Sequence, residues 1–412
     1  RIRRESVDRR YEWLSPETLW GGPLAAYGLI VRGPQPVLDL FSTENRNYAV
    51  ESGNGYSNFA TLRTRIAPGF GVDPDEIVVS YNTSAGMCHA VLGIPWQTGD
   101  VVVTTNHEHP GGDVPLQIAQ QRYGIIVRRV ILPSGDNQTP DDYKTLFRNE
   151  VLAARAAGQR VRAIMWSSPT FLTGTMLPIP QIMDVCREFN LISICDGAHL
   201  PGMMAYNYAE LGVDFMAGAG HKWQCGPGST GILVIRNKTR ASNQMPLPPY
   251  FPIATSSFQS TGVSWPSRTP TGSTTPYNIG NLVQSLGSMH TPMINALGKA
   301  CDEWDRIGRK NIETYVLTLS AYLKERIVER FGVEALYSPR HPELSSALTS
   351  FNPFQAVNAS LITQGTAGSG PSATLVSRMA SEASIVVRNT TTPVRNASGT
   401  LVNHFPIRIS TH

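Results

Sequence analysis

The chain has 412 residues, of which 41% are hydrophobic and 16% charged, and this composition is typical of a folded globular protein. One compact core does not accommodate such a length, so we expect a large domain and a smaller one. The net charge of +4 is small, and Lys and Arg form no run beyond the first ten residues, which argues against nucleic acid as the main partner.

Membrane and metal sites are not indicated either. No stretch approaches the roughly 20 apolar residues that cross a bilayer, so we expect no membrane span. The cysteines stand at positions 88, 186, 195, 225 and 301 and form neither a CxxC pair nor a Cys/His spacing suited to zinc. We therefore interpret them as buried thiols and expect no metal.

From residue 76 to 235, apolar runs of strand length alternate with segments of helical period. This alternation predicts an α/β fold in which helices cover both faces of a mostly parallel sheet, because the apolar runs read as strands buried on both sides. The expected strands are Ile77 to Tyr81, Val101 to Thr105, Ile125 to Leu132, Val161 to Trp166, Leu191 to Cys195, Asp214 to Ala217 and Gly231 to Ile235. We expect a seven-stranded sheet in the large domain.

One helix and the strand after it lead to a candidate site. Apolar residues recur at spacings of three and four after Pro178, which places them on one helical face. They are Ile179, Ile182, Met183, Cys186 and Phe189. The strand LISIC follows and ends in Asp196, whose carboxylate should emerge at the carboxyl edge of the sheet, where open α/β sheets bind ligands.

The rest of the chain divides by composition. Residues 242–277 are rich in Pro, Ser and Thr, which indicates a long excursion. Residues 278–331 have a helical pattern, and the segment after them is typical of a small α+β domain. We expect an N-terminal segment, 1–45, that packs with the small domain, a large domain, 46–285, and a small C-terminal domain, 286–412.

The segment GAGHKWQCGPGSTG, residues 218–231, holds a single lysine, Lys222, between two expected strands. Burial lowers the pKa of an ammonium, so a lysine enclosed there becomes an amine nucleophile for carbonyl compounds, including an aldehyde cofactor. A surface lysine in a glycine-rich turn remains the alternative.

Asp196 and the segment NTSAG, residues 82–86, add to this candidate site. A carboxylate beside a pyridine nitrogen keeps that nitrogen protonated, although an Asp at a strand end is as often a helix cap. Thr83 and Ser84 open a helical run, where free backbone N–H groups suit a phosphate. Simple helix capping is the alternative for these residues.

Two further motifs contribute an imidazole and a guanidinium. The segment NHEHPGG, residues 106–112, follows a strand and places His109 where its ring could lie on a cofactor, although a plain loop or a partial metal site would use the same residues. Arg408 lies on a short strand of the C-terminal domain, where its planar guanidinium could bind a substrate carboxylate through two hydrogen bonds. Surface ion pairing is the alternative for Arg408.

In this order, the motifs resemble those of class V, fold-type I enzymes that depend on pyridoxal 5'-phosphate (PLP), a group that includes cysteine desulfurases and isopenicillin N epimerase. The resemblance spans roughly residues 56–412 and implies an aspartate-aminotransferase-like fold with PLP as cofactor. It implies that Lys222 holds PLP as a Schiff base, that Asp196 pairs with the pyridinium and that His109 stacks on the ring. The implied phosphate contacts are Thr83, Ser84 and His221, and Arg408 would bind the substrate carboxylate.

The resemblance also implies a homodimer in which Gly272 and Ser273 of the partner subunit complete the phosphate site. Two positions depart from the desulfurase pattern: His199 replaces a Gln and would still reach the phenolic oxygen of PLP, whereas Ala219 replaces a Ser and removes one phosphate hydroxyl. No cysteine follows Asp302, so the nucleophilic loop cysteine of a desulfurase is missing. We therefore do not expect desulfuration.

As a whole, the chain is similar to exported enzymes that tailor the side chain of the siderophore pyoverdine. This implies a siderophore precursor as substrate, oxidative decarboxylation of its side-chain glutamate to succinamide, and a periplasmic location reached through twin-arginine export. The chain begins with Arg, so an export signal upstream is expected. Transamination or epimerisation of a free or peptidyl amino acid, a cytoplasmic location and a non-catalytic binding module remain alternatives.

Overall fold

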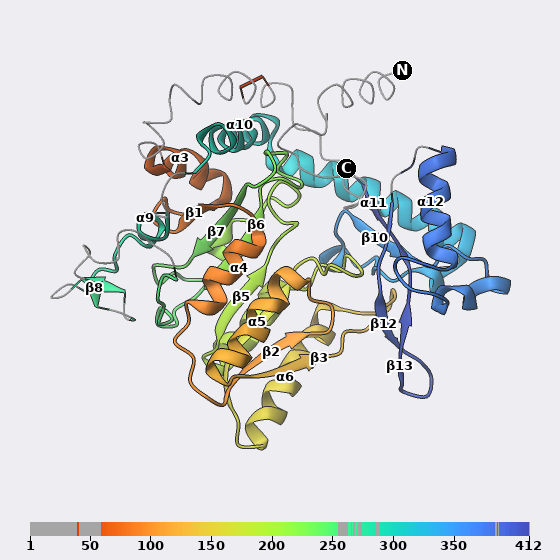
Figure 1. Cartoon of the computed structure of the whole chain (residues 1–412), viewed down its shortest axis with the longest axis horizontal. Coiled ribbons are helices and arrows are strands. Elements are labelled where there is room, and N and C mark those ends of the chain that lie inside the picture. The colour runs from red at the N-terminus through yellow and green to blue at the C-terminus, as the bar shows by residue number, and fades with distance from the viewer. Residues whose placement is uncertain are drawn as a thin grey trace.

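The computed structural model describes residues 39–40, 59–253, 263–264, 266, 268–270, 274–284, 289–383, 385 and 387–411. Its centre is a seven-stranded sheet in the order β1-β7-β6-β5-β4-β2-β3 (Figure 1). The strands are β1 (Ile77–Ser80), β2 (Asp100–Thr105), β3 (Ile126–Val130), β4 (Arg160–Ser167), β5 (Ile192–Asp196), β6 (Phe215–Ala219) and β7 (Gly231–Ile235). Every strand expected from the sequence is present, with ends shifted by at most two residues.

The sheet is mostly parallel, as expected. Parallel pairing joins β3, β2, β4, β5 and β6, whereas β7 runs antiparallel to both of its neighbours, β6 and β1. One expectation was wrong: β3 is an edge strand and is largely exposed or half-buried rather than covered on both sides. Its arginines face carboxylates, since Arg128 pairs with Glu150 and Arg129 with Asp113.

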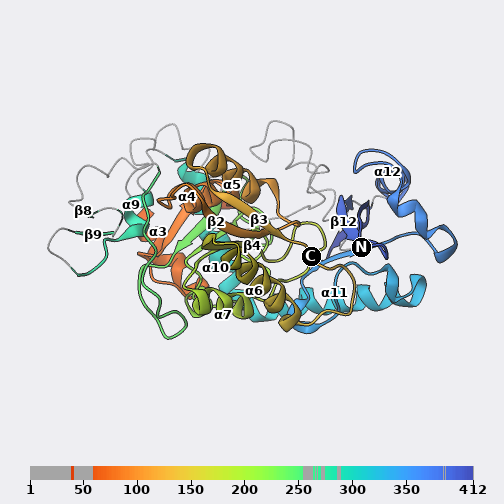
Figure 2. The same ribbon diagram turned by 90° about the horizontal axis from the view of Figure 1, so that it is seen from below.

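Helices cover both faces of the sheet (Figure 2). On one face lie α4 (Thr83–Leu92) and α5 (Pro110–Tyr123), and on the other lie α6 (Pro140–Ala156) and α7 (Ile179–Phe189). Side chains alternate between the two faces along each strand: Val101 and Val103 belong to the hydrophobic cluster under α6 and α7, and Val102 belongs to the cluster under α4 and α5. Two buried layers therefore hold the sheet rigid beneath the candidate site.

The helix read from the apolar spacing after Pro178 is α7. Ile179, Ile182, Met183 and Cys186 are buried, and Phe189 packs against the same cluster with partial exposure. The helix ends at Asn190, whose left-handed backbone, φ 52°, turns the chain back into β5. This short connection delivers Asp196 to the end of β5.

A second unit follows the sheet along the chain. Helix α11 (Arg309–Phe331) lies beside a three-stranded sheet, in the order β10-β14-β11, that packs with α12 (Pro371–Ala383) (Figure 1). Its strands are β10 (Leu348–Phe351), β11 (Arg388–Asn389) and β14 (Ile407–Ser410), and β12 (Thr392–Arg395) pairs with β13 (Leu401–His404). This is the expected small α+β unit, and Arg408 lies on its central strand.

The remaining elements surround these two units. They are α3 (Phe59–Ile66), α8 (Tyr208–Leu211), α9 (Ile279–Gln284), α10 (Thr291–Ile307) and the short pair β8 (Val263–Ser264) and β9 (Thr269–Pro270), with 3-10 turns at Ala67–Phe70, Val333–Ala335, Pro342–Leu344 and Ala356–Thr363. The expected boundaries at residues 45 and 285 fall outside the described residues, so the domain limits stay a prediction.

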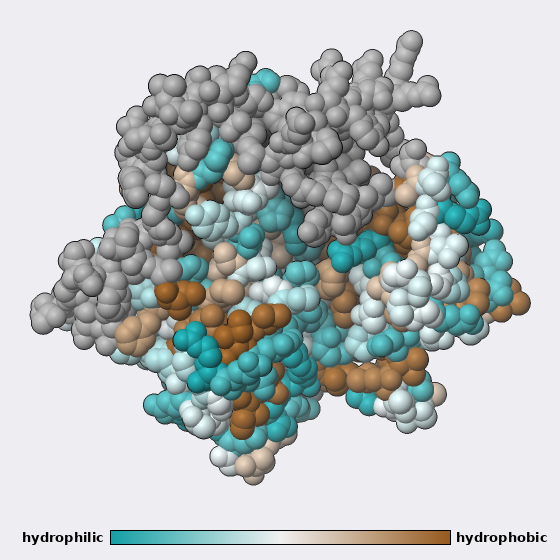
Figure 3. Space-filling view, viewed as in Figure 1, coloured by the Kyte–Doolittle hydropathy of each residue, from teal (hydrophilic) through white to brown (hydrophobic). Residues whose placement is uncertain are grey.

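The surface carries apolar side chains close to the candidate site. Among the helices of the described residues, none combines the length and the apolar character needed to cross a bilayer. The face seen in Figure 3 mixes hydrophilic and hydrophobic residues, and hydrophobic ones gather over α4 and α5. Val114 of α5 and Tyr81, just before α4, are 43% and 41% exposed. Apolar side chains are thus exposed beside the helix that opens with Thr83.

Candidate active site

Lys222 lies in the turn between β6 and β7, with its Nζ 3.2 Å from Nε2 of His199. The residue as a whole is partly exposed, but desolvation of its amine lowers the pKa of Lys222 to about 8, and the charge of Arg408 acts in the same direction. The Asp196 carboxylate opposes this shift. The amine of Lys222 therefore loses its proton more readily than an exposed lysine does, as a nucleophile for an aldehyde requires.

Asp196 ends β5 beside Ser167 of β4, at the carboxyl edge of the parallel strands. The residue is 3% exposed, and burial raises the pKa of its carboxyl group, whereas the charge of Lys222 lowers it. One oxygen accepts a hydrogen bond from the Ala198 N–H at 3.1 Å. A Cβ added to Gly112 would stand 3.0 Å from the other oxygen, so only a glycine leaves that oxygen uncrowded. A buried carboxylate in this position suits a cationic ring nitrogen.

The starts of α4 and α5 adjoin next to this carboxylate. A Cβ added to Gly111 would meet Oγ of Ser84 at 2.3 Å, so the two helix N-termini lie against each other. Asn82 caps α4 by accepting the Ala85 N–H at 2.8 Å, and Oγ1 of Thr83 is buried without a hydrogen-bond partner in the described part of the chain. Two positive helix ends and an orphaned hydroxyl fit a phosphate group.

His221 occupies the other candidate phosphate position. Its Nδ1 lies 3.0 Å from the carbonyl oxygen of Thr230, so Nδ1 carries the proton and donates it. Burial lowers the pKa of His221. In the neutral ring Nε2 is therefore an acceptor, and a contact between Nε2 and a phosphate oxygen requires this nitrogen to take up a proton.

His109 caps α5 by accepting the Gly111 N–H at 2.9 Å on Nδ1. Its ring packs edge-on against Phe171, with centroids 4.7 Å apart. Burial lowers the pKa of His109 to about 4, and the charge of Lys222 adds to this shift. The imidazole is therefore neutral and fixed in place, as a group that stacks on a ring must be.

Arg408 reaches the large domain from the small one. Its Nη1 donates to the carbonyl oxygen of Phe171, and its guanidinium lies 4.9 Å from the centre of the Phe171 ring. Arg388 stands opposite Arg408 in the register of the antiparallel strands β11 and β14, and its guanidinium lies 5.3 Å from the centre of the same ring. Burial lowers the pKa of Arg408 to about 9, and the neighbouring charge of Arg388 contributes. A carboxylate of a substrate would relieve this concentration of positive charge.

Three neighbours of the site were missed by the sequence reasoning. Phe171 is the aromatic platform for His109 and Arg408, and Trp223 donates from Nε1 to Nδ1 of His199 at 3.1 Å. Glu108 accepts the hydroxyl groups of Thr105 and Ser167, both at 2.5 Å, and burial raises its pKa to about 7. Glu108 stands next to His109 in the sequence and Trp223 next to Lys222, and this proximity could have indicated them as site residues. No sequence pattern indicates Phe171.

Two further expectations concern a partner subunit and a metal ion. Gly272 and Ser273, the expected contribution of a partner subunit, lie outside the described residues. Within the ranges that the structure describes, no group of three or more His, Cys, Asp or Glu side chains is placed to hold a metal ion.

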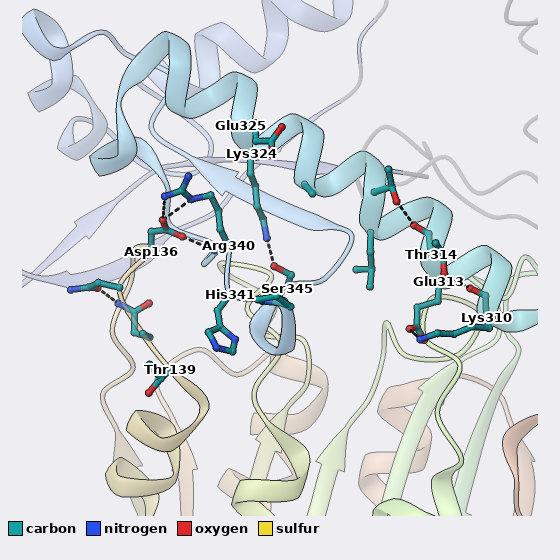
Figure 4. A pocket seen from close by; sticks show the side chains of 16 residues that line it. Asp136, Thr139, Lys310, Glu313, Thr314, Lys324, Glu325, Arg340, His341 and Ser345 are labelled. Carbon is teal, nitrogen blue, oxygen red and sulfur yellow. Dashed lines mark hydrogen bonds and ion pairs between the residues drawn. The ribbon is translucent and has the colours of Figure 1, made fainter.

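A separate cavity of about 890 Å³ lies between the two units (Figure 4). It is bounded by α11, by residues 136–139 and by residues 340–345. Four of its charged side chains form ion pairs: Arg340 with Asp136 and Lys310 with Glu313. The Nζ of Lys324 instead donates to the Pro339 carbonyl oxygen at 2.6 Å and to Oγ of Ser345 at 3.0 Å. The lining includes none of the residues proposed to bind PLP.

The buried Lys324 predicts a pH-dependent stability. Burial lowers its pKa in the folded protein from 10.5 to about 8, so the unfolded chain binds the proton more tightly between these values. The free energy of unfolding therefore rises with pH across this window, by about 3 kcal/mol from this group. Chemical denaturation of the native protein and of Lys324→Met should give values whose difference changes by that amount between pH 7.5 and roughly 10.5.

The exposed Lys310, replaced by methionine, is the control and should leave the pH dependence of the native protein unchanged. If the free energies of unfolding of the native protein and of Lys324→Met changed in parallel with pH, Lys324 would not be the source of the pH dependence.

Comparisons with known proteins agree with this geometry. A family model described as class V aminotransferase matches residues 38–366. Isopenicillin N epimerase from Amycolatopsis lactamdurans is 25% identical over 302 residues, which cover 71% of this chain and 70% of the epimerase. Probable cysteine desulfurase 2 from Mycobacterium leprae is 25% identical over 297 residues, which cover 70% of this chain and 64% of the desulfurase.

Solved structures share the fold. The cystine C-S lyase C-DES, in complex with cysteine persulfide, has a TM-score of 0.65 and 21% identity, covering 92% of this chain and 90% of the lyase. The apo cysteine desulfurase from Thermococcus onnurineus has a TM-score of 0.66 and 19% identity, covering 92% and 87%. A variant of C-DES carries glycine covalently linked to its PLP cofactor. The family model matches most of the chain and the fold is shared, so the chain belongs to the class V aminotransferase family of fold-type I, PLP-dependent enzymes.

Proposed function

We propose that this enzyme oxidatively decarboxylates a glutamate joined through its γ-carboxyl group to a siderophore precursor of the pyoverdine type, and leaves a succinamide. One molecule of dioxygen is consumed, the α-carboxylate departs as carbon dioxide, and water is the second product. The nitrogen of the glutamate stays in the product as the amide. Only this linkage leaves both the amine and the α-carboxylate of the glutamate free.

The observation that carries the proposal is the meeting of two guanidinium groups and one carboxylate around a single amine. The charges of Asp196 on β5 and of Arg388 and Arg408 in the small unit all act on Lys222. Bound PLP supplies an electron sink for bonds at the α-carbon. The chain would contribute the attachment point at Lys222, a proton held at the pyridine nitrogen by Asp196, and a carboxylate site at Arg408.

The other proposed residues would position the cofactor. His109 would cover one face of the cofactor ring, and Thr83, Ser84 and His221 would hold the phosphate. His199 would donate to the phenolic oxygen. Thr83, Ser84, His109 and His199 would act as neutral groups, whereas His221 would take up a proton to contact the phosphate. Together they would hold the cofactor and keep water from the reacting carbon.

The choice of reaction rests on the cysteines and on the resemblance to PvdN, an exported enzyme that tailors the pyoverdine side chain. No cysteine follows Asp302, and Cys186, Cys195, Cys225 and Cys301 are buried with raised pKa values, so none offers a reactive thiolate. Desulfuration, which needs such a thiolate, is therefore disfavoured. Transamination or epimerisation is the second candidate, because isopenicillin N epimerase is 25% identical over 71% of this chain.

The partner and the location form part of the same proposal. A homodimer would allow Gly272 and Ser273 of each subunit to complete the phosphate site of the other, and the exposed Val114 of α5 and Tyr81 just before α4 support such an interface. Work on an exported siderophore precursor would place the enzyme in the periplasm after twin-arginine export of the folded holoprotein.

Oxygen use and nitrogen retention decide between the two candidate reactions. With a precursor whose glutamate carries a nitrogen label, we expect uptake of dioxygen, release of carbon dioxide and a product that keeps the label. The measurements are gas uptake and product mass. Turnover without oxygen, with the label lost and a keto acid formed, would replace this proposal with transamination, and release of an inverted but otherwise unchanged glutamate would indicate epimerisation.

A further inference from the structure

Three side chains at the site form a continuous hydrogen-bonded series. Trp223 lies 3.1 Å, Nε1 to Nδ1, from His199, whose Nε2 lies 3.2 Å from Nζ of Lys222. Trp223 and His199 are 1% and 6% exposed, so water does not replace these contacts. The order of donors and acceptors along the series is fixed by chemistry.

Trp223 sets that order, because an indole N–H can only donate. Nδ1 of His199 must therefore accept with its lone pair and carries no proton. A neutral imidazole then has its proton on Nε2. Protonation of both nitrogens would bring two N–H groups face to face in a buried place, which is costly.

We propose that Trp223 is a positioning residue that fixes His199 as a neutral imidazole with its proton on Nε2. This nitrogen is then a permanent hydrogen-bond donor beside Nζ of Lys222, the atom that would bind the cofactor. In the cofactor-free protein the acceptor of this proton is the amine of Lys222 in its neutral form, which prevails above a pH of about 8. The inference rests on the proposed role of Lys222.

The surroundings favour the same state. The charged and titratable groups facing His199 and Lys222 are Asp196 on β5, His221 in the same turn, His109 at the start of α5, Arg388 on β11 and Arg408 on β14. Burial, followed by the charges of Lys222 and Arg408, lowers the pKa of His199 well below its usual value. The cations thus oppose a second proton on the ring, and Trp223 decides which nitrogen keeps the first.

The donor matters when PLP is bound. In bound PLP the phenolic oxygen would lie near Nζ of Lys222, which is 3.2 Å from Nε2 of His199, so this nitrogen could donate to it. Such a donor would compete with a proton on the lysine nitrogen and would lower the pH at which that proton is lost. Because accepting from Trp223 polarises the imidazole, Trp223 strengthens the donor at Nε2.

The first test is nitrogen NMR of the cofactor-free protein with labelled histidine. The chain has nine histidines, and the signals of His199 are those that disappear in His199→Gln. We expect a protonated Nε2 and an unprotonated, hydrogen-bonded Nδ1 that stay unchanged from about pH 8 to 10, the range in which the amine of Lys222 is mostly neutral and can accept the proton. A proton on Nδ1 in the native protein would overturn the proposal without any variant of Trp223.

The second test is a double-mutant cycle on the holoprotein, read from the pH midpoint of its visible absorption. His199→Ala should raise the midpoint by about one unit or more, and Trp223→Phe by a few tenths of a unit. In the His199→Ala background, Trp223→Phe should add nothing, because the tryptophan acts through the imidazole.

Trp96→Phe is the matched control, since Trp96 is also buried and donates to a backbone carbonyl, that of Val91, at 2.8 Å. It should leave the midpoint unchanged. Equal shifts from Trp223→Phe in both backgrounds, or no shift in the native background, would overturn the positioning role. A native protein with no visible band would instead remove the PLP assignment, and the NMR result would still decide the protonation of His199.

Discussion

Lys222→Ala is expected to abolish covalent attachment of PLP and to reduce activity by at least about a thousandfold, the scale on which removal of a covalent catalytic group acts. The reason is that the amine of Lys222, whose pKa burial lowers to about 8, is the proposed nucleophile for the aldehyde. Reduction of the holoprotein with borohydride followed by peptide mass mapping should place the cofactor on Lys222 in the native protein and nowhere in the variant.

Lys144→Ala is the control, because Lys144 pairs with Asp184 at the surface. It should retain the visible band and the activity. A Lys222→Ala protein that kept the native absorption would show that another amine holds the cofactor and would end the assignment of this site.

Arg408→Ala is expected to weaken substrate binding far more than cofactor binding. Removing one partner of a buried, hydrogen-bonded charge pair costs roughly 2–5 kcal/mol. Arg408 is 7% exposed, and its guanidinium contacts the carbonyl oxygen and the ring of Phe171, so the proposed substrate carboxylate would be its counter-ion. We expect KM for the precursor to rise by about thirtyfold or more, with an unchanged dissociation constant for PLP.

Arg378→Ala tests for a general effect of removing a guanidinium from the small unit, because Arg378 is exposed and pairs with Glu382 on α12. Its KM should equal that of the native enzyme. An unchanged KM in Arg408→Ala would indicate that the substrate carboxylate binds Arg388 instead, which lies over the same Phe171 ring. Kinetics of Arg388→Ala would then show the loss.

Local pattern was enough to predict the sheet and several site positions. Apolar runs of four to eight residues specify buried strands, because each side chain of a covered strand must leave water, and all seven strands lie where those runs are. Asp196 was predictable at the ligand edge because a parallel strand exposes its carboxyl end there. Lys222 and Arg408 became candidates through the order of motifs that resembles class V enzymes, because each residue alone also had a surface interpretation.

The sequence by itself therefore determined the α/β class, the strand positions and the residues to suspect, since these depend on short-range periodicity and residue type. The tertiary structure decided which of them meet. Phe171 brings His109 and Arg408 together from positions more than 200 residues apart, and no local pattern encodes that contact. The structure also decided protonation: burial and neighbouring charges lower the pKa of Lys222, and the indole of Trp223 directs the proton of His199, because both effects depend on distances through space.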